Sequence, residues 1–280
     1  MRTLLKTGFA LLLLAFVLIG LTFSMLRAQG VNTRGQVAGR ELATETRTVA
    51  ATVTEIDMSG ASDLTRRQGA VPSLTVRGEQ RLLGNVDTNQ DGDTLQIAVK
   101  GMLLHKRLPL QVTLVLPSIA SVRIKGNGDS TINGFSGERL DVVLDGSGGV
   151  KFNGRFKEVN AQLRGSGEME VNGGASEKVE VALAGSGQMT VVGSCEKFKV
   201  SLSGSGALDA QHLAAEAAAL QLHGSGTASV QATKSADVTV HGSGDVSVFG
   251  NPGKRDVSRT GSGNVTFRER ASSNQPKEDR

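Results

Sequence analysis

The residues most like a metal site lie in an alternating acidic stretch. Asp87, Asn89 and Asp91 alternate and are followed by Gly92, as in the first half of an EF-hand calcium loop. The twelfth position of such a loop holds a closing Glu, and here it is Ala98. An Asp-Gly turn between two strands accounts for the same residues. We therefore expect a β-hairpin, with calcium binding as the alternative, and we assign no metal-binding or cofactor-binding residue.

Two histidines and the single cysteine are further side chains with possible chemistry. His223 and His241 each precede a glycine of a repeated turn, so they should stack on adjacent repeats at the outer surface. The neighbouring repeats offer Ser203 and Thr260 rather than further ligands, which favours a solvated pair over a zinc site. Cys195 has no second cysteine and no nearby histidine, so we expect a passive thiol in a loop between repeats.

Charged residues occur as complementary neighbours rather than as paired carboxylates. The repeat places Glu180 beside Lys199 and Lys151 beside Glu170, as in surface ion pairs. Sugar-cleaving sites need paired carboxylates and usually aromatic rings, and this chain has no Trp and no Tyr. We assign no catalytic residue, and a carbohydrate-active β-helix enzyme of the lyase or hydrolase type remains the alternative function.

These side chains belong to a repeat that is defined by glycine. Gly-Ser-Gly recurs every 18 to 20 residues, and a variant, Gly126-Asn127-Gly128, precedes the first copy. The seven copies begin at Gly146, Gly165, Gly185, Gly204, Gly224, Gly242 and Gly261. A unit of this length can form only one coil of a solenoid, so the coils must stack to bury apolar side chains.

Apolar residues alternate on both sides of each glycine turn. Before Gly185 come Val181 and Leu183, and after it come Met189 and Val191. Alternation at period two predicts strands with these residues facing inward. We therefore predict an all-β fold, a single-stranded, right-handed parallel β-helix in which each coil is strand, Gly-Ser-Gly corner, strand and loop.

Parallel coils in register align equivalent outward residues in ladders. The spacing aligns Asn133, Asn153 and Asn172 on consecutive coils, and aligns Gln211 with Gln231. Stacked side-chain amides can hydrogen-bond along the stack, so we expect these ladders to be structural.

The amino terminus has the features of an export segment. Arg2 and Lys6 precede residues 8–26, an apolar run without charge, and Ala28-Gln29-Gly30 follows as a small-x-small pattern. A basic segment before an apolar core directs the rest of the chain across a membrane. Residues 1–30 are therefore a signal peptide or an uncleaved N-terminal hydrophobic helix that anchors the protein in the inner membrane.

The rest of the sequence divides by its regularity. Residues 31–46 are polar and aperiodic, and we expect a linker. Residues 47–118 predict irregular β coils that cover the open end of the stack, and residues 119–268 predict the regular solenoid. Residues 269–280 predict a disordered polar tail.

The net charge of the exported part, residues 31–280, limits the class of partner that it can bind. Of the 31 Lys and Arg residues, three lie in residues 1–30. This leaves 28 basic against 27 acidic residues, so nucleic acid is not expected as a partner.

In the last coil Arg255 and Arg259 take positions that are apolar in the earlier coils. Charge at the end of a stack blocks the addition of strands, which predicts a capped monomer.

Several of these features together resemble a known family. The exported amino terminus, the turn from Asp91 to Leu95, the segment from Leu108 to Pro117 and the Gly-x-Gly corners from Gly126 onward resemble the bacterial putative auto-transporter adhesin, head GIN domain family. The resemblance covers about residues 48–267. It implies a single-stranded β-helix, a periplasmic, envelope or extracellular location, and an adhesin-like role without a catalytic motif.

The residues and the resemblance together predict an exported, non-catalytic protein of the cell envelope with a binding or structural role. Its expected partner is an envelope protein or a glycan. If residues 8–26 are not cleaved, that segment also holds the protein at the membrane.

Overall fold

The structure is a computed structural model that describes residues 41–60, 63–100 and 110–269. Within these residues the chain forms one 17-stranded sheet and a single four-residue helix, α2 (Gln80–Leu83), which confirms the all-β prediction. No helix in these ranges is long and apolar enough to cross a membrane. The predicted signal or anchor, residues 1–30, and the predicted tail after Glu269 lie outside the described residues.

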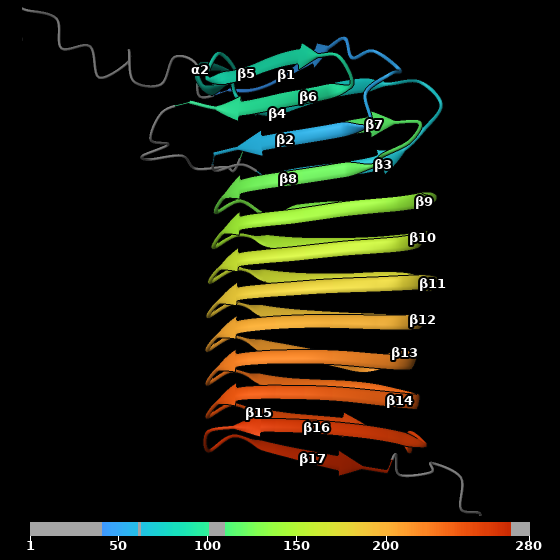
Figure 1. Ribbon diagram of the computed structural model, residues 1–280. Helices are drawn as coiled ribbons and strands as arrows, with labels where there is room; N and C mark the ends of the chain where they lie inside the picture. Colours follow the sequence, from blue (N-terminus) through green and yellow to red (C-terminus); the bar gives the residue numbers. More distant parts are fainter. Residues whose placement is uncertain (1–40, 61–62, 101–109, 270–280) are drawn as a thin grey trace, which may run out of the picture. The chain divides into compact units, whose positions relative to one another are not determined.

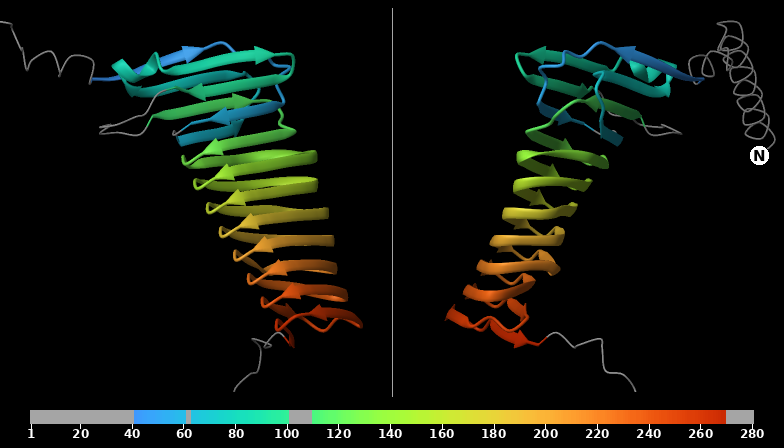
Figure 2. Two further views of the ribbon diagram at one scale, coloured as in Figure 1. Left: turned by 60° about the vertical axis from the view of Figure 1, so that its left-hand side comes forward. Right: turned by 90° about the vertical axis from the view of Figure 1, so that its right-hand side faces the viewer.

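Six long strands form the regular part of the solenoid, and they stack in sequence order (Figures 1 and 2). They are β9 (Ser130–Gly146), β10 (Gly149–Gly165), β11 (Glu168–Gly185), β12 (Gln188–Gly204), β13 (Ala207–Gly224) and β14 (Thr227–Gly242). Neighbouring strands are parallel and the corner glycines are in register, as predicted. The predicted inward residues are buried: Val181 and Leu183, for example, are 4% and 3% exposed.

The predicted loop opposite each corner is wrong. Each strand runs without interruption from one corner to the next, and it changes register where it bends, as between Asn153 and Glu158 of β10. At this bend β10 stays paired with the preceding strand β9 through Gly154, Arg155 and Phe156, whereas its pairing with β11 resumes only at Glu158, so the chain bends within a strand and not in a loop.

Each corner brings two coils close together through glycine. Gly185 has a φ of +128°, and a Cβ atom built on it would lie 2.3 Å from the carbonyl oxygen of Gly165 on the preceding coil. That same oxygen accepts hydrogen bonds from the backbone N–H groups of Ser186, at 3.0 Å, and Gly187, at 3.1 Å. The serines point outward and are exposed, so only the glycines are required by the packing.

The amino-terminal strands cap the stack in an order that differs from the sequence. They are β1 (Leu42–Arg47), β2 (Glu55–Ser59), β3 (Asp63–Gln68), β4 (Ser73–Glu79), β5 (Val86–Asp91), β6 (Thr94–Val99), β7 (Gln111–Leu116) and β8 (Ser121–Gly126). Strand β2 lies between β6 and β8, and β3 between β7 and β9, all in parallel (Figure 1). Strand β4 pairs antiparallel with β1 and β7, and β5 pairs antiparallel with β6.

The predicted linker over residues 31–46 needs a correction. Residues 42–46 lie in β1, which pairs with β4 along its whole length, from Leu42 opposite Glu79 to Arg47 opposite Leu74. The polar sequence of β1 gives no apolar alternation because its residues are exposed or half-buried. Its backbone pairing, rather than buried side chains, keeps it in the sheet.

The carboxy-terminal strands end the stack with arginines, as predicted. They are β15 (Asp245–Phe249), β16 (Lys254–Thr260) and β17 (Asn264–Arg268). The guanidinium of Arg255 lies 4.8 Å from the centre of the Phe267 ring and donates a hydrogen bond of 2.7 Å to Asn251 Oδ1. Every residue of β16 is exposed, so these arginines reach water while their stems cover the apolar end. The monomeric state remains a prediction.

One buried charge interrupts the apolar interior. Arg66 of β3 is 0% exposed, and its three guanidinium nitrogens have no hydrogen-bond partner. Burial lowers the pKa of its guanidinium to about 9. Ser130 faces inward from the adjacent strand β9, and its Oγ is also buried without a partner. Removing a charge from water without a partner destabilises the folded protein.

Replacing Arg66 by methionine is therefore expected to raise the free energy of unfolding, by about 1–4 kcal/mol. Above about pH 9, the pKa of Arg66 in the folded chain, the unfolded state binds more protons, because an arginine in water has a higher pKa. The stability of the wild type should therefore rise with pH in that window relative to Arg66→Met. Urea unfolding at neutral and alkaline pH measures this. The exposed Arg67→Met is the control, and a less stable Arg66→Met protein would show that the charge is compensated.

Candidate binding site

The sheet that precedes the corners presents two ladders of outward residues, which we call the pre-corner face. The ladder five residues before the corner glycine consists of Glu180, Lys199, Ala219, Asp237 and Asp256. The ladder seven residues before it consists of Lys178, Lys197, Ala217, Ser235 and Lys254. Parallel pairing in register therefore places the side chains of five strands beside one another on one surface, and four of these strands contribute charged residues.

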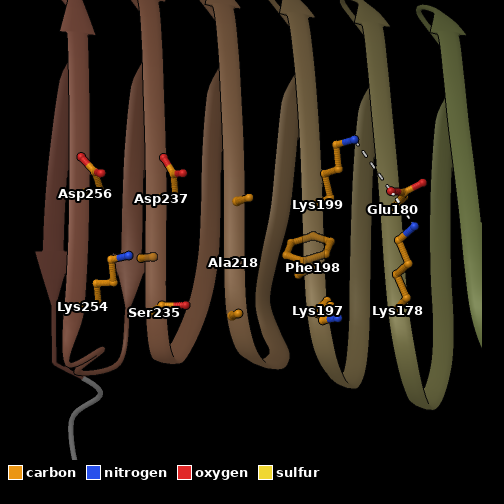
Figure 3. Close-up of a pocket in the computed structure, with 13 residues that line it drawn as sticks. Lys178, Glu180, Lys197, Phe198, Lys199, Ala218, Ser235, Asp237, Lys254 and Asp256 are labelled. Atoms are coloured by element: carbon orange, nitrogen blue, oxygen red, sulfur yellow. Dashed lines mark ion pairs between the residues drawn. The ribbon is translucent and has the colours of Figure 1, made fainter.

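The pre-corner face is hollowed where β13 carries alanine. Ala217 and Ala219 bring only methyl groups to positions where the neighbouring strands bring lysine, serine or aspartate, and a hollow of about 370 Å³ results (Figure 3). The inward residues Phe198, Ala218 and Ala236 line it at its base. We call this feature the alanine hollow. Its volume lies within the range of pockets that hold small ligands, about 300–1,000 Å³.

One side of the alanine hollow is basic. Lys178 Nζ and Lys199 Nζ both lie near Glu180 Oε1, at 3.0 Å and 3.8 Å (Figure 3). Lys197, on the same side, is exposed and has no ion pair in the part of the chain that the structure describes. This wall thus has three ammonium groups and one carboxylate, which leaves a positive excess.

The opposite side is acidic. Asp237 of β14 and Asp256 of β16 are neighbours in one ladder, and both are exposed. Neither carboxylate forms an ion pair within the described ranges, and the half-buried Ser235 adds a hydroxyl group. Lys254 on β16 adds one cation to this wall, against the two carboxylates. The two walls stand on either side of β13, so their backbones are about two strand spacings, roughly 9.6 Å, apart.

The calcium-like stretch forms the expected hairpin. Strand β5 pairs antiparallel with β6 from Val86 opposite Val99 to Asp91 opposite Thr94, and Gly92 has a φ of +60° in the turn. Asp87 forms an ion pair with Lys100. The three acidic and amide side chains thus follow an extended strand instead of wrapping round a loop. Among the described residues, no three His, Cys, Asp or Glu side chains gather as metal ligands.

The two histidines lie as the sequence predicts. The rings of His223 and His241 are stacked, with centroids 4.9 Å apart and planes inclined by 12°. Ser203 and Thr260 pair beside them on the neighbouring strands. Both imidazoles are exposed, which agrees with a solvated pair.

The position predicted for Cys195 is wrong, although its expected inertness is supported. Cys195 lies within β12 rather than in a loop, between Ser176 and Ala215 on the adjacent strands, and it is 5% exposed. Burial raises the pKa of its thiol to about 12, so the thiolate that reacts as a nucleophile is disfavoured at neutral pH.

The predicted ladders are confirmed in part. Asn153 pairs with Asn133 and Asn172 on the two adjacent coils, as expected. Gln211 does not pair with Gln231. The register of β13 against β14 shifts between Ala210 and Ala214, so Gln231 pairs with Ala214 and is only 8% exposed.

Both predicted surface ion pairs are present. Lys199 approaches Glu180 at 3.8 Å, and Lys151 Nζ lies 3.4 Å from Glu170 Oε2. The alanine hollow was not predicted from the sequence, because alanine carries no polar or reactive group that would mark a binding site. The signal was nevertheless present: Ala217, Ala218 and Ala219 are consecutive, whereas every other coil that ends in a Gly-Ser-Gly corner has at least one charged residue at the equivalent positions.

Solved structures share this fold. The described architecture matches a putative lipid binding protein from Parabacteroides distasonis ATCC 8503 with a TM-score of 0.75 and 24% identity, over 81% of this chain and 97% of that one. It also matches a putative adhesin from Parabacteroides merdae ATCC 43184 with a TM-score of 0.76 and 20% identity, over 81% and 96%. These likenesses establish the fold.

Comparison with the family models and with curated proteins completes the assignment. No curated protein matches the sequence. The model of one family matches residues 52–252, which cover most of the glycine-cornered coils and nearly all of the amino-terminal cap. The chain therefore belongs to the family described as putative auto-transporter adhesin, head GIN domain.

Proposed function

We propose that this protein is an exported, non-catalytic protein of the cell envelope that binds its ligand as an adhesin-like module. The observation that carries the proposal is the alanine hollow, where a regular charged surface opens between a basic wall and an acidic wall. Its partner is an envelope protein or a glycan. Residues 8–26 either anchor the protein in the inner membrane or are removed with the signal peptide.

The environment of Asp141 argues against its use as a general acid. A general acid in a glycosidase needs a raised pKa. Asp141 is partly buried, and burial alone raises the pKa of its carboxyl; hydrogen bonds from Arg139 and Asn160 outweigh it, so that the pKa is lowered. This carboxylate is therefore suited to an ion pair and not to proton donation.

The relatives support a binding role as well. The matched family is described as a putative auto-transporter adhesin, the P. merdae structure as a putative adhesin, and the P. distasonis structure as a putative lipid binding protein. The arginines that end the stack at β16 favour a monomer, since an exposed charged end does not accept another strand. A monomeric solenoid presents the alanine hollow to a partner without obstruction from a second copy.

The proposal predicts that capture of envelope components depends on the alanine hollow. Full-length protein, Ala219→Leu and Ala184→Leu would each be immobilised and exposed to envelope proteins and to a glycan array. Ala219→Leu fills the hollow, while Ala184→Leu makes the same change at an exposed position of the same face beside a corner. We expect the wild type and Ala184→Leu to retain the same partner, and Ala219→Leu to lose it at least tenfold. Equal capture by all three proteins would contradict the proposal, and so would no capture by the wild type.

A further inference from the structure

The alanine hollow has two walls of opposite charge, and this arrangement narrows the class of ligand. A simple anion would be attracted by the lysines but repelled by the aspartates. A simple cation would be attracted by the aspartates but repelled by the lysines. A zwitterion satisfies both walls at once. We propose that the alanine hollow binds a small zwitterion that carries a phosphate and a primary ammonium, the phosphoethanolamine group; the inference rests on the proposed binding function of the same site.

The basic wall fits the phosphate. Lys197 is exposed and has no ion pair among the described residues, so its ammonium is available. Lys199 lies 3.8 Å from Glu180, whereas Lys178 holds the same carboxylate at 3.0 Å. Because the longer, exposed contact is weak, Lys199 can turn to a ligand while Lys178 keeps Glu180 neutralised. Two lysines on one strand then act as point charges for the phosphate oxygens.

The acidic wall fits a primary ammonium. Such a group donates three hydrogen bonds, and Asp237, Asp256 and Ser235 offer acceptors on two adjacent strands. A quaternary ammonium would need exposed aromatic faces instead. The one aromatic residue of the hollow, Phe198, is 1% exposed, and the chain has no Trp and no Tyr. The site therefore distinguishes ethanolamine from choline.

The alanine hollow has room for the polar group. Its volume is about 370 Å³, and its apolar lining outside the sheet consists of the methyl groups of Ala217 and Ala219. The charged groups of the two walls address the polar group of a ligand and not an acyl chain. Free O-phosphoethanolamine should therefore bind without a bilayer, and the alanine methyl groups should pack against its two carbon atoms.

Calorimetric titration of the full-length protein with O-phosphoethanolamine tests the inference. We expect saturable binding that is unchanged in Ala184→Leu and at least tenfold weaker in Ala219→Leu. Phosphocholine should bind at least tenfold more weakly than O-phosphoethanolamine. Asp237→Asn should weaken O-phosphoethanolamine and leave inorganic phosphate unaffected or tighter, whereas Lys197→Gln should weaken both.

Three results would overturn the inference. The first is equal affinity for inorganic phosphate and O-phosphoethanolamine, which would identify an anion site only. The second is binding to phosphatidylethanolamine vesicles that free O-phosphoethanolamine does not displace, which would identify a bilayer surface. The third is no binding of O-phosphoethanolamine. If envelope capture still depended on Ala219 in that case, the ligand class would be wrong and the proposed function would stand.

Discussion

Replacing Gly185 by valine is expected to destabilise the solenoid by about 3 kcal/mol or more, whereas Ser186→Ala should change the free energy of unfolding by less than about 0.5 kcal/mol. Gly185 has a φ of +128°, where a β-branched residue is strained, and its Cβ would lie 2.3 Å from Gly165 O. That oxygen accepts two backbone hydrogen bonds of the corner, so moving it away breaks them as well.

Thermal unfolding of the two corner variants, side by side, measures this difference. The serine is exposed at the outside of the corner, so its substitution removes little. A clear fall in melting temperature for Gly185→Val alone would support the steric role of the corner glycines. Similar melting temperatures for the two variants would show that the coils can separate at a corner without cost.

Leu183→Asp is expected to abolish folding, while Ala184→Asp should leave the protein folded. Leu183 is 3% exposed, and its Cδ2 lies 2.8 Å from the position that a Cβ on Gly206 would take, so it packs under the next corner. Loss of the buried leucine costs about 2–5 kcal/mol, and burial of a carboxylate without a partner adds several more. The sum approaches the whole stability of a typical domain, about 5–15 kcal/mol.

Circular dichroism and size-exclusion chromatography distinguish the two aspartate variants. Ala184 is the next residue in the same strand and is exposed, so it tests the same charge on the opposite face. A soluble, folded Leu183→Asp protein with native circular dichroism would mean that the inward and outward faces are assigned the wrong way round.

The sequence predicts the corners and the inward register because both are local. Alternation at Val181 and Leu183 specifies which side of a strand is buried, and the spacing from Gly165 to Gly185 specifies one coil. The far bend of each coil was predicted wrongly as a loop, because continued pairing with one neighbouring coil, such as that of Gly154 with Phe135 of β9, has no local signal in the sequence. The shift after Ala210, which separates Gln211 from Gln231, is likewise set by pairing between coils.

The order of the amino-terminal strands could not be predicted from local alternation. Strand β2 pairs with β6 and β8, about 40 and 65 residues later in the chain, and such distant pairing has no local signal. The burial of Arg66 was also not predicted from the sequence. Arg66 lies two residues after Leu64, and this alternation places it on the inward face. Its charge, by contrast, favours an exposed position.

The alanine hollow can be recognised only when the register between β12, β13 and β14 is known. Ala217 and Ala219 become a hollow only because Lys197 and Lys199 pair on one side and Ser235 and Asp237 on the other. The sequence alone contains the small residues, but the pairing between coils decides which long side chains stand beside them.

The most direct test of this account is an NMR titration of full-length protein labelled with ¹³C at the alanine methyl groups. On addition of O-phosphoethanolamine, the account predicts saturable shifts of the Ala217 and Ala219 methyl resonances and no shifts at Ala182 and Ala184 of β11. Saturable shifts at β11 in place of β13, or binding that leaves Ala217 and Ala219 unchanged, would contradict the claim that the alanine hollow is the binding site.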